Sequence, residues 1–287
     1  MEGKAYAYAM AAVFMWATVA SAFKITLRYI SPFQLLFFSS IVSTLILFLT
    51  LLITHKIYQI NVGRRRFLHS AFLGFLNPFL YYNVLFLAYD MLPAQEAMTL
   101  NYMWPIVLTI LAIPLLRQKV GARSIAALLI SFFGVIIIST HGNIFTLHFS
   151  NPIGISLALG STVIWATFWI FNVKDKEDEV VKLFINFLFG VFFIFIAAIF
   201  IGIDFPCKKA LIGATYVGIF EMGLTFILWL RALRLAPTTA KISNLIYLAP
   251  FLSMIFIHFI VGEKILPSTL AGLLFIVSGI LIQQKVQ

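Results

Sequence analysis

The chain of 287 residues is 62% hydrophobic and only 10% charged, with a mean hydropathy of +1.04. A soluble protein of this length needs a charged surface, which so few charges cannot cover, so the composition predicts an integral membrane protein. The formal net charge of +10 is then assigned to basic residues that flank membrane spans, not to nucleic-acid binding. The single cysteine, Cys207, excludes an intrachain disulfide and a cysteine metal cluster.

Apolar runs of about the length of a membrane-spanning helix recur along the whole chain, joined by short connections that contain proline or glycine. We therefore predict an all-α integral membrane protein with ten transmembrane helices, near residues 4–23, 33–54, 67–89, 93–116, 122–140, 152–173, 181–203, 209–231, 237–261 and 267–284. The first run also fits a cleavable signal peptide, because Lys4 precedes it and Ala20-Ser21-Ala22 follows it. We interpret it as a retained helix, since its removal would delete the counterpart of a later span.

The basic residues are divided unevenly between alternate connections. With a cytoplasmic N-terminus, the cytoplasmic segments hold Lys4, Lys56, Arg64, Arg65, Arg66, Arg117, Lys119, Arg123, Lys174, Lys176, Lys182, Arg231, Arg234 and Lys285. The outer segments hold only Lys24, Arg28, Lys208, Lys209 and Lys264. Because lysine and arginine collect on the cytoplasmic side, we expect both termini in the cytoplasm and the protein in the inner (plasma) membrane.

The second half of the chain repeats features of the first. A shift of about 145 residues pairs Tyr102 with Tyr247, Pro105 with Pro250 and Gly134 with Gly279, and a shift of about 149 pairs Trp16 with Trp165. We expect two repeats, residues 1–142 and 152–287, with five helices each. Because five is odd, the second repeat crosses the membrane in the opposite sense. Inverted repeats of this kind favour alternating access to a site near the midplane.

The second half also carries an ordered set of short motifs: Leu248-Ala249-Pro250, Gly262-Glu263-Lys264, Ala271-Gly272 and Gly279. Together with the ten predicted helices, this order resembles the EamA-type transporters of the drug/metabolite transporter superfamily, over essentially the whole chain. The resemblance implies ten helices around a central cavity and transport of small metabolites, usually outward and in many members proton-driven. The first half departs from the pattern, because Arg117-Gln118-Lys119 stands where the family usually has Gly-Glu-basic.

The segment Asn101-Tyr102-Met103-Trp104-Pro105 resembles a stretch of the family's aromatic amino acid exporters. It favours amino acid export by a secondary active transporter. The alternatives are import of a nucleotide-like metabolite such as S-adenosylmethionine and broad drug efflux. Outside transport, a membrane scaffold or sensor is the alternative.

Ionisable side chains inside a membrane are costly and therefore indicate function. Glu221 lies in the middle of the predicted eighth span, where it could carry a proton or bond structurally to a neighbouring helix. Its repeat counterpart is Asn77, followed by Pro78, which binds substrate or satisfies the helix break at the proline. Lys241 snorkels to the interface, or else it pairs with Glu221 or with a substrate carboxylate.

Aromatic and amide side chains inside the spans complete the predicted substrate site, which comprises Trp16, Asn77, Tyr82, Asn101, Tyr102, Trp165, Asn244 and Tyr247. Rings suit aromatic or cationic solutes, and amides orient a ligand, although plain helix packing explains any single one of them. No metal-ligand spacing, nucleotide-binding loop or catalytic constellation stands out. We therefore expect no enzyme and no cofactor. The expected partners are a small-molecule substrate and the lipid bilayer, with no nucleic acid, and the expected state is a monomer or weak homodimer.

Overall fold

The computed structural model describes residues 2–60, 63–116, 122–143, 151–174, 177–235 and 244–284. Within these ranges all regular secondary structure is helical, which confirms the predicted all-α class. The elements are α1 (Glu2–Thr26), α2 (Pro32–Ile53), η1 (Ile57–Gln59), α3 (Arg64–Gly74), η2 (Phe75–Leu80), α4 (Tyr81–Met91), α5 (Ala94–Asn101), α6 (Trp104–Leu116), α7 (Ala122–Ser139), α8 (Pro152–Lys174), α9 (Glu179–Ile201), α10 (Lys208–Val217), η3 (Gly218–Gly223), α11 (Leu224–Leu235), η4 (Asn244–Tyr247), α13 (Leu248–Phe256), η5 (Ile257–Val261) and α14 (Pro267–Gln284).

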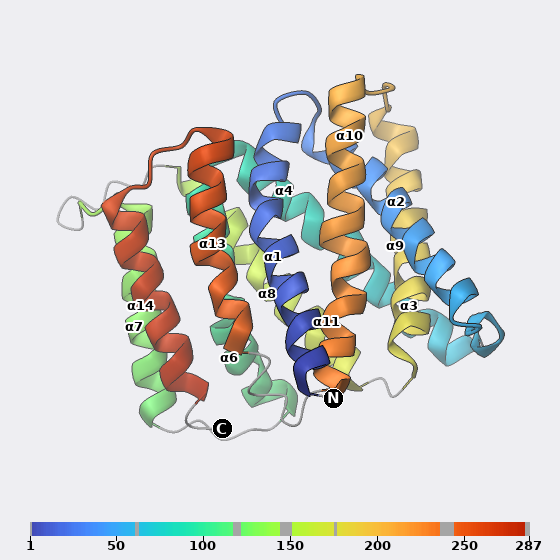
Figure 1. Cartoon of the computed structure of the whole chain (residues 1–287), viewed down its shortest axis with the longest axis horizontal. Helices are drawn as coiled ribbons and strands as arrows, with labels where there is room; N and C mark the ends of the chain where they lie inside the picture. Colours follow the sequence, from blue (N-terminus) through green and yellow to red (C-terminus); the bar gives the residue numbers. More distant parts are fainter. Residues whose placement is uncertain are drawn as a thin grey trace.

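The helices stand side by side in one bundle (Figure 1). Helices α7 and α14 form one end of the bundle, α2, α3 and α9 form the other, and α1 lies between them. We call the edge where α1 begins and α14 ends the lower edge, and the opposite one the upper edge. Among the described residues, six helical segments are long and apolar enough to cross a membrane, and three shorter apolar helices accompany them.

Local sequence explains where several helices begin. At the start of α2, Ser31 accepts a hydrogen bond from the amide of Gln34, whose side chain bonds back to the Ser31 amide, and Pro32 occupies the first turn. Asp178 caps α9 by accepting from the amides of Val180 and Val181.

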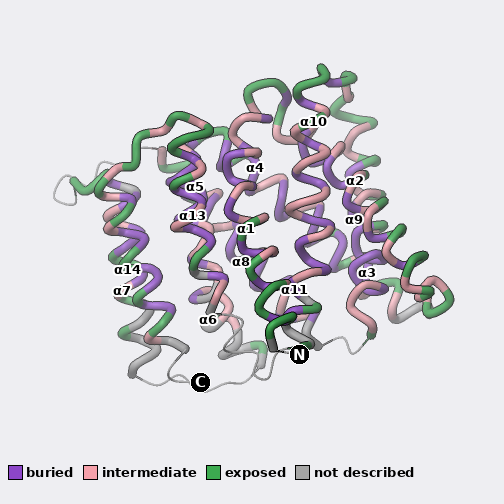
Figure 2. The backbone as a smooth tube through the Cα atoms, viewed as in Figure 1, coloured by how far each residue is buried: buried purple, intermediate pink, exposed green. Residues whose placement is uncertain are grey.

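Large apolar side chains cover the outside of the bundle as well as its core. Phe200 on α9 is 84% exposed and Phe259 on η5 is 79% exposed. Buried residues run along the inner faces of the helices, while the exposed ones lie on outer faces and at the upper edge (Figure 2). Helices that are apolar all round in this way are suited to lipid contact.

Four predicted spans depart from a regular α-helix, and a kink was expected only at Pro78. In the span predicted at 67–89, η2 holds Asn77 outside helical geometry, at φ −149° and ψ 118°, before a cis Asn77–Pro78 bond. The span predicted at 93–116 is two helices, α5 and α6, separated at Tyr102 and Met103, just before Pro105. Proline lacks the N–H that would continue a helix, which accounts for the first two breaks. The span predicted at 209–231 contains the π-helical turn η3. The described part of the span predicted at 237–261 comprises η4, α13 and η5.

The two halves of the chain pack against each other through glycines. A Cβ on Gly74 would lie 2.3 Å from the carbonyl oxygen of Asn186 on α9, so the two backbones are in direct contact. In the same way, a Cβ on Gly218 would lie 2.6 Å from the carbonyl oxygen of Ser39 on α2. These pairs stand at nearly equivalent places in the two predicted repeats, with each half contributing one glycine.

Helices α7 and α14 also pair closely. The hydroxyl of Ser131 donates to the carbonyl oxygen of Ile276 at 3.3 Å, and Gly134 faces the carbonyl of Gly272. Residue numbers at these contacts increase along α7, from Ser131 to Gly134, and decrease along α14, from Ile276 to Gly272. The two helices are therefore antiparallel, as Figure 1 also shows. The exact count of ten spans and the inverted repeat stay predictions, which these packing relations support.

Candidate functional site

A hydrogen-bonded tyrosine and carboxylate lie within the bundle. The hydroxyl of Tyr82 on α4 donates to Oε1 of Glu221 on η3 at 3.1 Å. Tyr82 is fully buried, whereas the Glu221 residue is part-exposed. Within the described residues, Glu221 forms no ion pair. A carboxylate inside a membrane protein is costly, which makes Glu221 a candidate functional residue.

The π-helical turn η3 is what presents Glu221. Such turns leave the regular hydrogen-bond ladder and occur frequently at functional sites. Here the hydroxyl of Thr225 donates to the carbonyl of Phe220, which supplies a partner at the irregular turn. The equivalent turn of the first half, η2, carries Asn77 at the position that corresponds to Glu221.

A second polar group lies one residue away on α4. The hydroxyl of Tyr81 lies 3.5 Å from Oδ1 and 3.4 Å from Nδ2 of Asn101, at the end of α5. The Asn101 amide donates in turn to the hydroxyl of Ser161 on α8, at 2.9 Å. This chain of polar groups connects α4, α5 and α8, and it holds the Asn101 side chain in one orientation.

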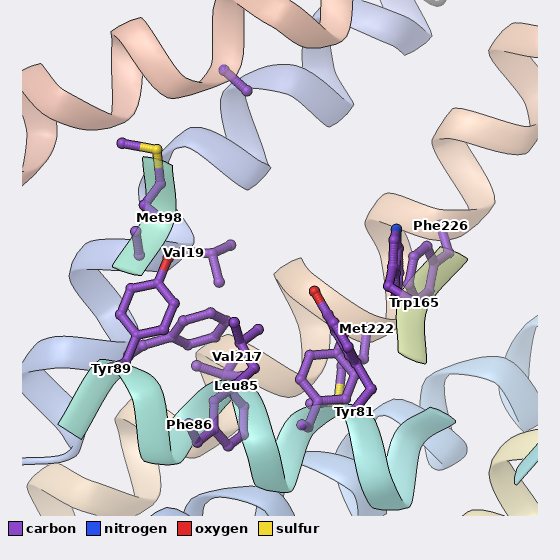
Figure 3. Close-up of a cluster of buried hydrophobic side chains, with 14 of the residues drawn as sticks. Val19, Tyr81, Leu85, Phe86, Tyr89, Met98, Trp165, Val217, Met222 and Phe226 are labelled. Carbon is purple, nitrogen blue, oxygen red and sulfur yellow. The ribbon is translucent and has the colours of Figure 1, made fainter. Parts of the chain in front are cut away.

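Aromatic rings surround these polar groups. The rings of Tyr81 and Trp165 on α8 have centroids 4.6 Å apart, and Trp165 stacks on Phe226 of α11 with centroids 5.9 Å apart and an interplanar angle of 24°. Figure 3 shows Tyr81 beside Met222, with Trp165 and Phe226 adjacent. Phe226 also contacts the edge of Trp16 on α1, at 6.2 Å, and Trp16 contacts Trp229 at 5.5 Å.

The result is a continuous aromatic wall, contributed by α1, α4, α8 and α11, which we call the aromatic cluster: Trp16, Tyr81, Tyr82, Trp165, Phe226 and Trp229. Ring faces bind planar or cationic groups by stacking and by cation–π attraction. Glu221 adds a hydrogen-bond acceptor and Asn101 adds an amide. Both groups can orient a ligand. Aromatic rings with a few placed polar groups are the side chains that typically line small-molecule sites.

The structure brings five of the predicted site residues into this network: Trp16, Tyr82, Asn101, Trp165 and Glu221. Tyr102 is part-exposed at the break between α5 and α6. Asn77 is fully buried, and neither atom of its amide has a hydrogen-bond partner among the described residues. Lys241 lies outside the described residues, as do the side chains of Asn244 and Tyr247, so the predicted Lys241–Glu221 pair stays a prediction.

Several members of the network were not among the predicted residues: Tyr81, Ser161, Phe226 and Trp229. Two carried a usable signal, because Tyr81 precedes Tyr82 and Ser161 lies one helical turn before Trp165. Phe226 carried none in a chain with 31 phenylalanines. Across the described part of the chain, no group of three histidine, cysteine, aspartate or glutamate side chains could hold a metal ion.

The sequence profile of the EamA-like transporter family matches residues 3–140 and, a second time, residues 152–283. The chain belongs to the EamA-like transporter family. It is 25% identical over 211 residues to the uncharacterized transporter YvbV of Bacillus subtilis, a match that covers 71% of this chain and 68% of that protein. It is 22% identical over 272 residues to an uncharacterized transporter of Archaeoglobus fulgidus, which covers 92% of this chain and 91% of that one.

A crystal structure of another protein has the same fold as this EamA-like chain. The two superpose with a TM-score of 0.69 at 17% identity, over 99% of this chain and 97% of the other. Membership of the family and the apolar helices together establish a multi-pass membrane transporter embedded in a lipid bilayer. The expected resemblance to the aromatic amino acid exporters in particular is not confirmed by these relatives, whose names give no substrate.

Proposed function

We propose that this EamA-like protein is a secondary active transporter that moves a small organic metabolite, an amino acid, out of the cell by proton-coupled alternating access. The observation that carries the proposal is the Tyr82–Glu221 hydrogen bond beside the aromatic cluster. This hydrogen bond places the Glu221 carboxylate, which can exchange a proton, next to aromatic rings that can bind an organic solute.

Proton coupling is supported by the position of Glu221. Its carboxylate lies in the interior of a membrane protein, bonded to a neutral hydroxyl and, within the described residues, to no cation. Such a group can exist protonated or ionised, and each form favours different partners. Tyr82 is in the first half of the chain and Glu221 in the second, so a change of protonation acts on a contact between the halves.

Alternating access is supported by the packing of the two halves. Gly74 and Gly218, at equivalent places, each contact the opposite half through backbone. The family profile matches the chain twice, over ranges close to the proposed repeats 1–142 and 152–287. Two inverted halves that rock about such contacts would expose a central site first to one side and then to the other.

The substrate class follows from the groups around the site. Rings of Trp16 and Trp165 suit planar or cationic parts of a solute, and Asn101 offers an amide for a polar part. A zwitterionic amino acid with an aromatic side chain would use all three. Efflux of cationic drugs is the second candidate, because aromatic rings next to a carboxylate also attract an organic cation.

The test is solute flux in proteoliposomes with an imposed pH gradient, for a panel of amino acids, nucleosides and cationic drugs. We expect gradient-dependent flux of one class, with the dependence lost in Glu221→Gln. Glu221→Asp, which keeps the carboxylate on a shorter side chain, should retain part of it. Flux that ignores the gradient would reject proton coupling. Absence of flux for the whole panel, from protein that is folded and correctly inserted, would favour the scaffold or sensor alternative.

A further inference from the structure

The N-terminus of α5 lies at the upper edge and is capped by the opposite half of the chain. Pro93 is the N-cap residue, and it makes no side-chain hydrogen bond to the helix. Glu263 fills this role: Oε1 accepts from the amide of Ala94 at 2.9 Å, and Oε2 accepts from the amide of Gln95 at 3.3 Å. A carboxylate at a helix N-terminus satisfies amides that have no helical partner and faces the positive end of the helix dipole.

Gln95 completes the connection in the other direction. Its amide nitrogen donates to the carbonyl of Lys264 at 2.7 Å, and its amide oxygen accepts from the backbone N–H of Leu266 at 3.3 Å. Gln95 is only 4% exposed, so these bonds are shielded from competing water. The two side chains thus hold α5 of the first half to the loop that precedes α14 in the second half.

This loop, residues 262–266, has no regular secondary structure. Gly262 ends η5 with φ +83°, a left-handed conformation that favours glycine and turns the chain sharply. Lys264 and Ile265 then point outward and are exposed, whereas Glu263 and Leu266 are part-buried toward α5. Glu263 accepts from two amides of α5, and Gln95 bonds to the backbone of Lys264 and Leu266, so these polar bonds tie the loop to α5.

A further bond crosses the same edge. The guanidinium of Arg28, just after α1, donates to the carbonyl of Val261 at 3.2 Å, at the last residue of η5. By contrast, Lys24 donates to the carbonyls of Tyr89 and Leu92, all within the first half. Lys24 therefore fixes α1 to α4, while Glu263 and Gln95 fix one half to the other.

We propose that Glu263 and Gln95 form the upper gate of the transporter. Their hydrogen bonds to the opposite half are intact while the upper side is closed, as in this structure, and they break when the central site opens toward that side. The gate rests on the alternating access proposed above. It is separate from the substrate site, because neither residue contacts the aromatic cluster.

The two predicted repeats differ in sequence at the position of Glu263. The position that corresponds to Glu263 at a shift of 145 is Gln118, whose side chain is neutral. A neutral amide lacks the charge that strengthens a bond to a helix N-terminus. Of these two corresponding positions, only the second repeat carries a carboxylate, so we expect Glu263 to favour the state that is closed at the upper edge.

The first measurement is hydrogen–deuterium exchange of the detergent-solubilised, full-length protein. We expect the amides of Ala94, Gln95 and Leu266 to be protected, and protection at Ala94 and Gln95 to fall in Glu263→Ala. The second measurement uses Met98 on α5, which is 3% exposed and lies beside Val19 of α1 (Figure 3). It is replaced by cysteine in a Cys207→Ser background and labelled with a membrane-impermeant maleimide.

If the gate holds the upper side closed, Met98→Cys should be labelled at least about tenfold faster in Glu263→Ala than in the parent, because two charge-assisted hydrogen bonds to the amides of Ala94 and Gln95 are lost. Glu263→Gln keeps an acceptor, so its increase should be smaller, and Gln95→Ala should also label faster than the parent. Asp178→Asn is the matched control. It breaks an ion pair with Lys56 that joins the halves at a different place, so it should leave the labelling rate unchanged.

Equal labelling rates in parent and Glu263→Ala would overturn the gate, as would an equal rise in Asp178→Asn. Unprotected amides at Ala94 and Gln95 in the parent would overturn it too. If Glu263→Ala fails to fold, Glu263→Gln and Gln95→Ala decide the question by the same readouts. Neither measurement uses a solute, so the test of the gate is independent of the test of transport. If labelling follows the expected pattern but no solute flux is measured, the gate is supported and only the proposed transport is rejected.

Discussion

Tyr82 and Glu221, which lie 139 residues apart in the chain, are joined by a single hydrogen bond of 3.1 Å between the two halves. Within the described residues, this bond is the direct polar contact of the Glu221 carboxylate. Any movement of one half relative to the other therefore changes the environment of that carboxylate. This relation gives the first prediction.

Tyr82→Phe should reduce gradient-driven flux by about tenfold, because it removes one hydrogen bond to a charged group and leaves the ring in place. It should not abolish coupling, since Glu221 itself remains. Proteoliposome flux with and without a pH gradient measures both effects. Wild-type flux in Tyr82→Phe would show that the bond is structural. Leu87→Val, a change at an exposed position of the same helix, serves as the control.

Trp165→Phe should weaken substrate binding by about threefold to tenfold while the protein stays folded, because a smaller ring keeps part of the stacking on Phe226 and Tyr81. Trp165→Ala is a poorer test. Trp165 is 8% exposed, so its truncation should also cost about 3–5 kcal/mol of stability. Binding is measured by isothermal titration and stability by thermal unfolding. Unchanged affinity in Trp165→Phe would assign the ring to packing.

Gly190→Ala should destabilise the protein by about 1–3 kcal/mol, because its Cβ would lie 2.2 Å from Cδ of Pro78 and 3.0 Å from the carbonyl oxygen of Gly74. Gly160→Ala on α8 is the matched control. No atom lies within 4 Å of its Cβ, so the change should be neutral or stabilising through helix propensity. Thermal unfolding in detergent compares the two. Equal melting temperatures would contradict the close contact between the halves.

The Lys56–Asp178 ion pair, at 2.6 Å, should give stability that depends on pH. Burial alone would raise the pKa of Asp178, but the hydrogen bond and charge of Lys56, with the amides of Val181 and Val180, hold that pKa below its ordinary value of 3.8. A lowered pKa in the folded state stabilises the fold above pH 3.8, and this contribution is lost as the pH falls through the folded-state pKa.

Asp178→Asn should therefore cost less than about 1 kcal/mol at neutral pH, because the pair is only partly buried, and the cost should shrink below about pH 4. Asp178→Ala also removes the cap of α9 and should cost about 1 kcal/mol more at any pH. Unfolding of the three proteins between pH 3 and pH 7 measures both contributions. A difference between wild type and Asp178→Asn that does not vary with pH would refute the ionic part.

Cys207 offers a test of orientation. It is exposed just before α10, at the upper edge, whereas α1 begins and α14 ends at the lower edge. If both termini are cytoplasmic, an impermeant maleimide should label Cys207 in intact cells, and Cys207→Ser should remove the signal. Labelling only after the cells are permeabilised would reverse the proposed orientation.

Much of the fold could be predicted from sequence because apolar runs of suitable length leave few alternatives in a membrane. Helix interruptions were harder. The break at Pro78 was foreseen as a kink, but the one at Tyr102 and Met103 was not, although Pro105 follows it closely. The π-helical turn at Glu221 has no proline and follows from packing that sequence does not display.

The site was predicted unevenly for a similar reason. Glu221 and Trp165 stand out because a carboxylate and a paired tryptophan are rare inside spans. Phe226, which links Trp16 to Trp165, could not be distinguished from many other phenylalanines, since its role depends on which helix faces which. The bonds of Glu263 to α5 join residues 169 and 168 positions apart, a relation that only the three-dimensional structure reveals.

The hydrogen bond from Ser131 to the carbonyl of Ile276 joins two residues that are 145 positions apart, which is the spacing of the predicted repeat itself. A residue touches its own counterpart only on a twofold axis, and that is the signature of an isologous dimer interface. If the two predicted repeats are inverted, the α7–α14 pair corresponds to a contact between two identical subunits inserted in opposite directions. A gene duplication that fused such subunits would have turned an ancestral homodimer into this single chain.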